Sequence, residues 1–124
     1  MILGKFVDNR AMLPVRFCLS EDTELTIDFV VDTGFNDYLT LPPQAVAAMN
    51  LVFHSTGSMR LANGSSLSMS MYFAEINWDN QKISVPVVAT GTKPLLGTAL
   101  LEGFRLTINF EPDGLVQFQN LPDR

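Results

Sequence analysis

Short apolar runs separated by turn residues set the pattern of this 124-residue chain. Apolar and polar residues alternate over 2–7, 66–78 and 105–110, which is the period of a strand with one buried face. The same reasoning predicts further strands at 13–19, 25–31, 38–41, 58–61, 82–89 and 115–119. Many short strands joined by turn signals are typical of an all-β fold.

Two segments break this pattern and favour short helices. Residues 42–50 begin with two prolines, which a first helical turn tolerates, and continue with alanines, which propagate a helix. Asn50 suits the cap that ends it. Residues 98–101 have room for one or two turns before Gly103. We therefore expect one or two short helices in an otherwise all-β chain.

Asn63-Gly64 is the strongest hairpin signal in the chain, because asparagine followed by glycine suits a tight turn between two strands. Serines alternate with apolar residues along the arm that follows it. A hairpin with one serine-rich face is not wholly buried. We therefore expect the segment 59–73, with its tip at residues 62–64, to project from the body.

The bulk composition fits one domain spanning residues 1–124, which is long enough to bury its own core. Charged residues make up 17% of the chain, below the usual quarter, and apolar residues make up 47%. A surplus of apolar surface is what an obligate dimer would show. A compact β domain would show it too.

Charge and cysteine usage narrow the function classes. The net charge is −5 and the eight basic residues are scattered, which disfavours nucleic-acid binding. The longest apolar run is too short to span a membrane, and the N-terminus lacks the pattern of a secretory signal. Cys18 is alone and cannot form an internal disulfide, so we expect a cytoplasmic location.

Asp32-Thr33-Gly34 is the best candidate for chemistry. It follows the apolar run 26–31, so a strand would carry the carboxylate to its end and the glycine would let the chain turn. On its own, the triplet could be an ordinary Asx turn. The chain lacks the ligands for a zinc site, because it has one histidine (His54) and one cysteine. We expect no metal and no cofactor.

Three segments, in the right order, resemble the retropepsin-like aspartic peptidases, which include the retroviral proteases and their single-domain bacterial and eukaryotic relatives. The first is Val30–Gly34. The second is Pro94–Leu101, with two apolar residues, a glycine, two variable residues and Leu-Leu. The third is Leu106–Phe110, close to the last strand of the retroviral enzymes. A glycine-containing hairpin lies between the first two, where the family has its flap. Together they are far more specific than the triplet alone.

The resemblance implies a closed, barrel-like β protomer of a two-fold dimer. Asp32 from each chain would form the catalytic pair, because this chemistry needs two facing carboxylates and the chain has one triplet. Thr33 would bond across the dimer axis, and Gly34 would leave room for the substrate backbone. Leu95-Leu96-Gly97 would cross near the turn and support it.

The function implied is that of a homodimeric aspartic endopeptidase acting on extended polypeptide. Leu61 and Val88 are further apolar candidates for the walls of the cleft. The residues expected to bind substrate are Phe35, Asn36, Asp37, Ala62, Asn63, Gly64 and Leu96.

This chain departs from the family at two places. Phe35 stands where retroviral enzymes usually have alanine and pepsin-like enzymes have serine or threonine, and it would narrow the neighbouring subsites. Retroviral enzymes also pair an aspartate two positions past the triplet with an arginine after the glycine of the second segment. Those positions are Asn36 and Thr98 here, so both charges are absent together.

Two other interpretations stay open. The chain could be a catalytically silent peptide-binding or regulatory dimer of the same fold, since fold does not fix function. It could also be an unrelated monomeric β-barrel. The intact Asp32 favours the peptidase, and the mass in solution separates the monomer from both dimers.

Overall fold

The fold is known from a computed structural model, which describes residues 1–122. Within that range the chain forms ten strands and two short helices. The all-β prediction and both predicted helices are confirmed. The elements in chain order are β1 (Ile2–Val7), β2 (Arg10–Ser20), β3 (Thr23–Val31), β4 (Leu39–Leu41), α1 (Pro43–Met49), β5 (Val52–Arg60), β6 (Ser66–Trp78), β7 (Gln81–Ala89), β8 (Leu95–Leu96), α2 (Thr98–Leu101), β9 (Phe104–Ile108) and β10 (Gly114–Asn120).

The helix α1 begins and ends as its residues predict. Pro43 lies in its first turn, where a missing N–H leaves no intrahelical bond unmade. Asn50 ends it in the left-handed region, at φ 55° and ψ 46°, and its N–H donates to the Ala47 carbonyl at 3.1 Å. Val46 and Met49 are the helix residues that are buried against the sheet.

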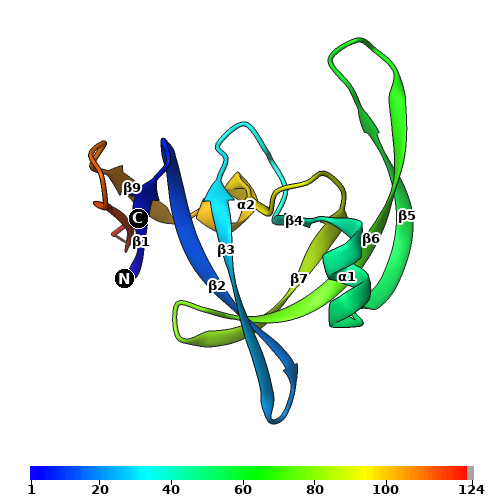
Figure 1. Cartoon of the computed structure of the whole chain (residues 1–124), viewed down its shortest axis with the longest axis horizontal. Coiled ribbons are helices and arrows are strands. Elements are labelled where there is room, and N and C mark those ends of the chain that lie inside the picture. The colour runs from blue at the N-terminus through cyan, green and yellow to red at the C-terminus, as the bar shows by residue number, and fades with distance from the viewer. Residues whose placement is uncertain (123–124) are drawn as a thin grey trace.

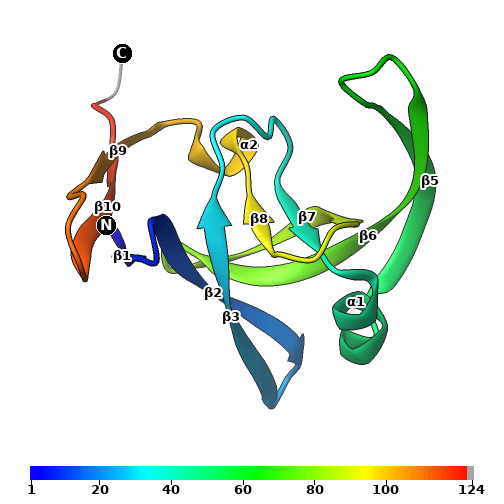
Figure 2. The same ribbon diagram turned by 45° about the horizontal axis from the view of Figure 1, so that its top comes forward.

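The strands form one hydrogen-bonded sheet in the order β5-β6-β7-β4-β8-β3-β2-β1-β10-β9. An additional pairing joins β6 to β2, with Arg16 opposite Asn77 and Phe17 opposite Ile76. Backbone ladders therefore run from β2 through β3, β8, β4, β7 and β6 and return to β2. Figures 1 and 2 show these strands in the middle of the molecule.

Apolar side chains fill the middle of this circuit. Alternate residues of β2 are buried while those between them face outward, as the two-residue period of a strand requires. The rings of Phe17 and Phe29 stack with their centroids 5.9 Å apart. The ring centroid of Trp78 lies 6.0 Å from those of Phe104 and Phe118, so β9 and β10 share the same core.

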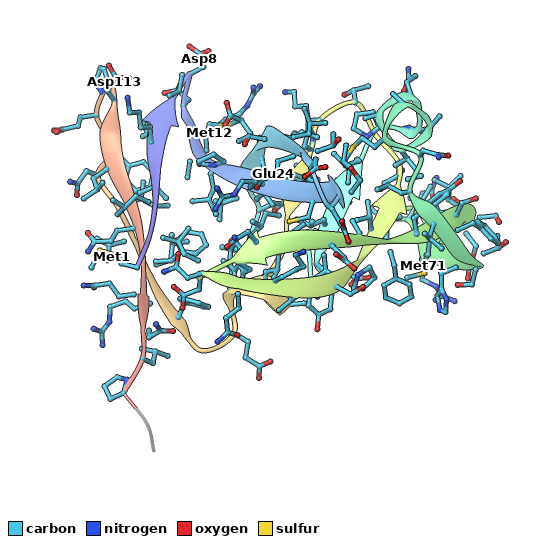
Figure 3. All side chains as sticks on the ribbon, turned by 90° about the horizontal axis from the view of Figure 1, so that it is seen from below. Met1, Asp8, Met12, Glu24, Met71 and Asp113 are labelled. Atoms are coloured by element: carbon cyan, nitrogen blue, oxygen red, sulfur yellow. The ribbon has the colours of Figure 1, made fainter. Side chains whose placement is uncertain are left out.

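Two parts of the sheet extend beyond the circuit at opposite ends of the molecule. The β5–β6 hairpin stands out at one end, and β1, β10 and β9 form the other (Figure 1). Figure 3 shows the same separation from below, with Met71 far from Asp8 and Asp113. The sequence-based expectation that the hairpin projects from the body is therefore confirmed.

The strand β5 is longer than the pattern predicted. It starts at Val52, whereas alternation indicated a strand only from residue 58. The reason is a bulge between Phe53 and Ser55, which places His54 out of register and breaks the two-residue period. His54 therefore lies in an edge strand and not in a helix-to-strand connection. Its ring packs on Phe73 at 4.7 Å.

Candidate active site

The turn at Asp32 is held by backbone hydrogen bonds directly after β3. The Asp32 N–H donates to the Leu96 carbonyl at 2.9 Å, and the Phe35 N–H donates to the Asp32 carbonyl at 3.2 Å. The Gly34 N–H donates to Asp32 Oδ1 at 2.9 Å. Asp32 is half-buried, whereas Thr33 and Gly34 are exposed. One carboxylate oxygen is thus fixed by the turn, and the residues after it face outward.

The strand β8 passes beside this turn and supports it. It pairs in parallel with β3 and antiparallel with β4, so it lies between the two strands that flank the turn. The Gly97 N–H donates to the Tyr38 carbonyl at 2.9 Å, and the Thr98 N–H donates to the Phe35 carbonyl at 2.8 Å. The crossing expected for Leu95-Leu96-Gly97 is therefore confirmed.

Gly97 is the tightest point of this crossing. A Cβ at position 97 would lie 2.2 Å from the Asp37 carbonyl oxygen, 2.6 Å from the Phe35 carbonyl oxygen and 2.5 Å from Phe35 Cδ2. Only glycine fits, because two of these atoms belong to the backbone of the turn. The Phe35 ring lies against Gly97, so at least one edge of the ring packs on the supporting strand.

Asn36 and Thr98, the two positions that lack the family's charges, lie together. The Thr98 hydroxyl donates to Asn36 Oδ1 at 3.5 Å. The Ala99 N–H also donates to the Asp37 carbonyl at 3.2 Å. A neutral contact and backbone bonds thus join the turn to α2 where the retroviral enzymes would have an ion pair.

Leu96 does not have the exposure expected of a substrate-binding residue. Its side chain is 0% exposed, because it points into the core with Leu39 on the neighbouring strand. Side chains alternate along a strand, so Leu95 points to the other face and is half-buried. The exposure expected of Leu96 is therefore wrong, and Leu95 is the more exposed of the two leucines.

Strand register identifies the row of side chains on that other face. Residues paired across neighbouring strands share a face, and Asp32 follows Val30 by two positions on the same strand. The row crosses five strands and contains Met71, Val88, Thr40, Leu95 and Val30. Val88 and Thr40 are buried in this row, whereas Val30, Leu95 and Met71 are half-buried and leave apolar surface on the face that Asp32 shares.

The hairpin tip and the Asp32 turn project from the same side of the molecule (Figures 1 and 2). Ala62, Asn63 and Gly64 are all exposed. Gly64 has a φ of +87°, and its N–H donates to the Leu61 carbonyl at 2.9 Å, which closes a four-residue turn. The tip therefore lies on the side where a flap over Asp32 would have to be.

A small pocket lies between the hairpin and the active-site turn. It has a volume of about 140 Å³ and is lined by Asp37, Gly57, Ser58, Met69, Met71 and Val88. Asp37 Oδ1 accepts the Tyr38 N–H at 2.9 Å, which orients its carboxylate. Met69 and Met71 alternate with serines along β6, which is the sequence signal that one face of this arm is apolar.

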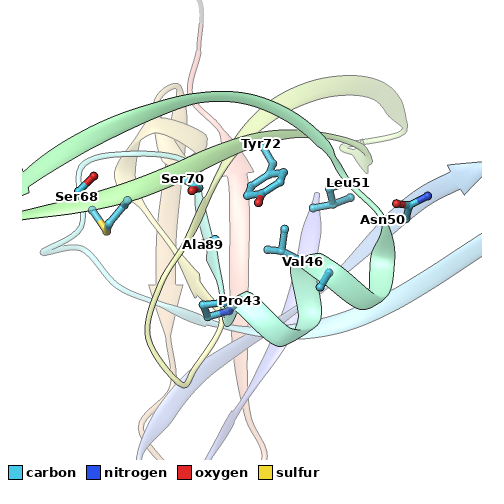
Figure 4. Close-up of a pocket in the computed structure, with 10 residues that line it drawn as sticks. Pro43, Val46, Asn50, Leu51, Ser68, Ser70, Tyr72 and Ala89 are labelled. Carbon is cyan, nitrogen blue, oxygen red and sulfur yellow. The ribbon is translucent and has the colours of Figure 1, made fainter.

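A larger hollow lies between α1 and β6, at the base of the hairpin (Figure 4). Its volume is about 530 Å³, and its lining combines apolar side chains with the Tyr72 hydroxyl, two serines and Asn50. Figure 4 shows the Tyr72 hydroxyl pointing toward the helix. The lining contains no carboxylate, cysteine or histidine, so none of these groups stands beside its hydroxyls to act as a general base.

Within residues 1–122, no group of three histidine, cysteine, aspartate or glutamate side chains could hold a metal ion. Cys18 is half-buried and free. Neither helix of the described chain is long and apolar enough to cross a membrane.

Comparison with known proteins supports the fold. No protein-family model matches the sequence, and no curated protein matches it. Among solved structures, the chain is similar to the crystal structure of a retropepsin-like aspartic protease from Rickettsia conorii. The alignment covers 98% of this chain and 92% of that one, with a TM-score of 0.56 and 18% sequence identity. At this identity the likeness shows a retropepsin-like fold and says nothing further of activity.

Proposed function

We propose that the chain is a homodimeric aspartic endopeptidase, in which Asp32 from two copies activates a water molecule. The observation that carries the proposal is the Asp32 turn itself. Its carboxylate stands at the end of β3, oriented by the Gly34 N–H, and β8 braces the turn from the side. The retropepsin-like fold supports the same conclusion. Each protomer would be one domain built on the closed circuit of strands, in a barrel-like arrangement.

The chemistry follows from placing two such carboxylates face to face. Two carboxylates in contact cannot both ionise cheaply, so they share one proton. The ionised carboxylate takes a proton from the bound water, which attacks the scissile carbonyl. The protonated carboxyl donates to the carbonyl oxygen. The tetrahedral intermediate then breaks the C–N bond as a proton passes to the leaving amine, and no metal or cofactor takes part.

The substrate would be an extended polypeptide with apolar residues near the cut. Leu95 and Met71 offer apolar surface, and the hairpin would cover the chain while backbone hydrogen bonds hold it as an added strand. The floor of the substrate cleft would contain Phe35, Asn36 and Asp37. The flap over it would contain Ala62, Asn63 and Gly64. We place this activity in the cytoplasm, where the free Cys18 would stay reduced.

The test combines mass in solution with cleavage of an unfolded protein. Light scattering should give about 27 kDa, twice the 13.7 kDa of one chain. Asp32→Asn should abolish cleavage and leave the dimer and its melting temperature unchanged or slightly higher, since the amide is nearly isosteric and removes the repulsion between carboxylates. Asp28→Asn is the matched control, because Asp28 is exposed on the same strand and should have no effect.

The outcomes separate the alternatives. A strict monomer at high protein concentration would remove the peptidase, since one carboxylate cannot run the mechanism. A confirmed dimer without cleavage at any acidic or neutral pH would favour a silent peptide-binding module. Activity that survives Asp32→Asn, or that chelators remove, would show that the assignment of Asp32 is wrong. Active wild type should work best at acidic pH and lose activity as the second carboxyl ionises.

A further inference from the structure

The tip of the β5–β6 hairpin carries a second reactive arrangement, separate from Asp32. Eight asparagines occur in the sequence, and only Asn63 precedes a glycine. A glycine at the next position leaves its backbone nitrogen uncrowded, so that nitrogen can approach the asparagine side chain. Both residues are exposed at the turn, so solvent base can reach the Gly64 amide proton once the turn opens.

The side chain of Asn63 is held in a way that favours attack on it. The Ser65 N–H donates to Asn63 Oδ1 at 3.0 Å, and the Ser65 hydroxyl donates to the same oxygen at 2.6 Å. Two donors on one carbonyl oxygen draw electrons from the Cγ atom. They also stand where negative charge would develop if a nucleophile added to Cγ, which is the arrangement that stabilises an oxyanion.

We propose that Asn63 is a site of spontaneous self-modification, in which the Gly64 backbone nitrogen closes on the Asn63 side chain to form a succinimide. Solvent base removes the Gly64 amide proton, and the nitrogen forms a bond to Asn63 Cγ, with the negative charge on Oδ1. Nδ2 takes a proton from solvent as the bond from Cγ to Nδ2 breaks, the charge on Oδ1 returns to form the carbonyl, and ammonia leaves. Water opens the ring at either carbonyl, which gives aspartate or isoaspartate.

One bond must break before this reaction can start. The Gly64 N–H donates to the Leu61 carbonyl, so the turn has to open to free the nitrogen. Residues 61–68 are all exposed, and few apolar contacts resist local opening there.

The product would change the tip in two ways. Either product adds a negative charge to a chain whose net charge is already −5, and isoaspartate also lengthens the backbone by one carbon. The bonds from Ser65 could not re-form around a lengthened backbone in the same geometry. Slow loss of flap closure would follow, and this consequence, unlike the modification itself, rests on the proposed peptidase function.

The test follows mass and isoaspartate in the full-length Asp32→Asn protein, so that self-cleavage cannot interfere. Samples are kept at mildly alkaline pH, folded or unfolded in urea, and their peptides are mapped over days. We expect a gain of about 1 Da at Asn63 ahead of the other seven asparagines, with isoaspartate detected by enzymatic methylation. Readout by mass does not depend on peptidase activity.

Two variants at one position test the role of the side-chain donors. Ser65→Ala removes the hydroxyl donor. It should lower the rate of modification at Asn63 about threefold or more in the folded chain and leave the rate in urea unchanged. Ser65→Thr keeps a hydroxyl and should retain most of the rate. No gain at Asn63, or a gain no faster than at the other asparagines, would overturn the site. Equal folded rates for Ser65→Ala and wild type would overturn the contribution of the hydroxyl.

Discussion

The Asp32 turn and the tip of the β5–β6 hairpin are built on the same local motif. In each, a side-chain oxygen accepts a backbone N–H two residues later: Gly34 N–H to Asp32 Oδ1 at 2.9 Å, and Ser65 N–H to Asn63 Oδ1 at 3.0 Å. Both are Asx turns of the kind that aspartate and asparagine form readily. Their surroundings differ completely.

The difference lies in what crosses each turn. The strand β8 passes beside the Asp32 turn. The Leu96 carbonyl accepts the Asp32 N–H, and the N–H groups of Gly97 and Thr98 donate to carbonyls that follow the triplet. At the hairpin tip, the hydrogen bonds of Leu61, Gly64 and Ser65 stay within the tip itself. The same motif is therefore fixed by a neighbouring strand in one place and held only by its own hydrogen bonds in the other.

The largest expected effect comes from filling the space at the crossing. Gly97→Ala would place a methyl group on two carbonyl oxygens of the turn, and we expect a loss of about 3 kcal/mol or more in the free energy of unfolding. Gly57→Ala is the matched change in the hairpin. Its methyl would meet only the Met71 sulfur at 3.3 Å, a flexible side-chain atom. It should change stability by no more than about 0.5 kcal/mol.

Urea unfolding of both variants measures this contrast. Equal losses would mean that the crossing at Gly97 is no more constrained than an edge strand, which would contradict the comparison. A Gly97→Ala protein that unfolds cooperatively at the wild-type midpoint would do the same.

A smaller effect is expected from Thr40, which is 3% exposed in β4. Its hydroxyl accepts the Leu95 N–H at 3.1 Å and donates to the Lys93 carbonyl at 3.5 Å, so it holds the start of the crossing strand. Thr40→Val keeps the shape but leaves the Leu95 N–H without this acceptor. We expect a loss of about 2 kcal/mol by thermal or urea unfolding.

Thr26→Val serves as the control for that change, because Thr26 is exposed on β3. It should alter stability by no more than about 0.5 kcal/mol. If both valines cost the same amount, the hydroxyl of Thr40 does not support β8, and the bracing of the turn rests on backbone bonds alone.

The smallest effect on global stability is expected at the tip. Gly64 has a φ of +87°, and Gly64→Ala forces a Cβ into that region at a local cost of about 1 kcal/mol. Because the tip opens without the rest of the sheet, the urea midpoint should hardly move. Amide hydrogen exchange at Leu61 should instead become faster, while exchange at Asp32 stays slow. A clear drop in the midpoint would show that the tip is coupled to the core.

Most of the fold could be predicted from local pattern. Two-residue periodicity located the strands, and prolines, alanines and Asn50 located α1. The missed part of β5 has a physical cause, since the bulge at His54 breaks the period on which the prediction depends.

The backbone conformation of the tight turns was less predictable, because different residue pairs form them in different ways. Asp8-Asn9 and Asp79-Asn80 adopt positive φ at both positions without any glycine, whereas Asn63-Gly64 uses positive φ only at the glycine.

The candidate site was less predictable, because exposure depends on register. The sequence predicted the Asp32 turn and the strand that supports it. It also predicted an exposed Leu96, whereas Leu96 is buried and its neighbour Leu95 points to the other, half-buried face. A two-residue strand gives too short a pattern to show which residue faces inward. Counting alternate positions back from Asp32 identifies Val30, and only the pairing with β8 then identifies Leu95.

The pairing of the first strand with the last bears on how the chain folds. Ile2 lies opposite Phe118, and β1 also pairs with β2, so β1 sits between segments from both ends of the sequence. Contacts over such separations close slowly, because a long loop must be ordered first. During synthesis, β1 would remain without one neighbour until residues 114–120 have left the ribosome. We therefore expect the central circuit to form first and the sheet at the chain ends to be completed last.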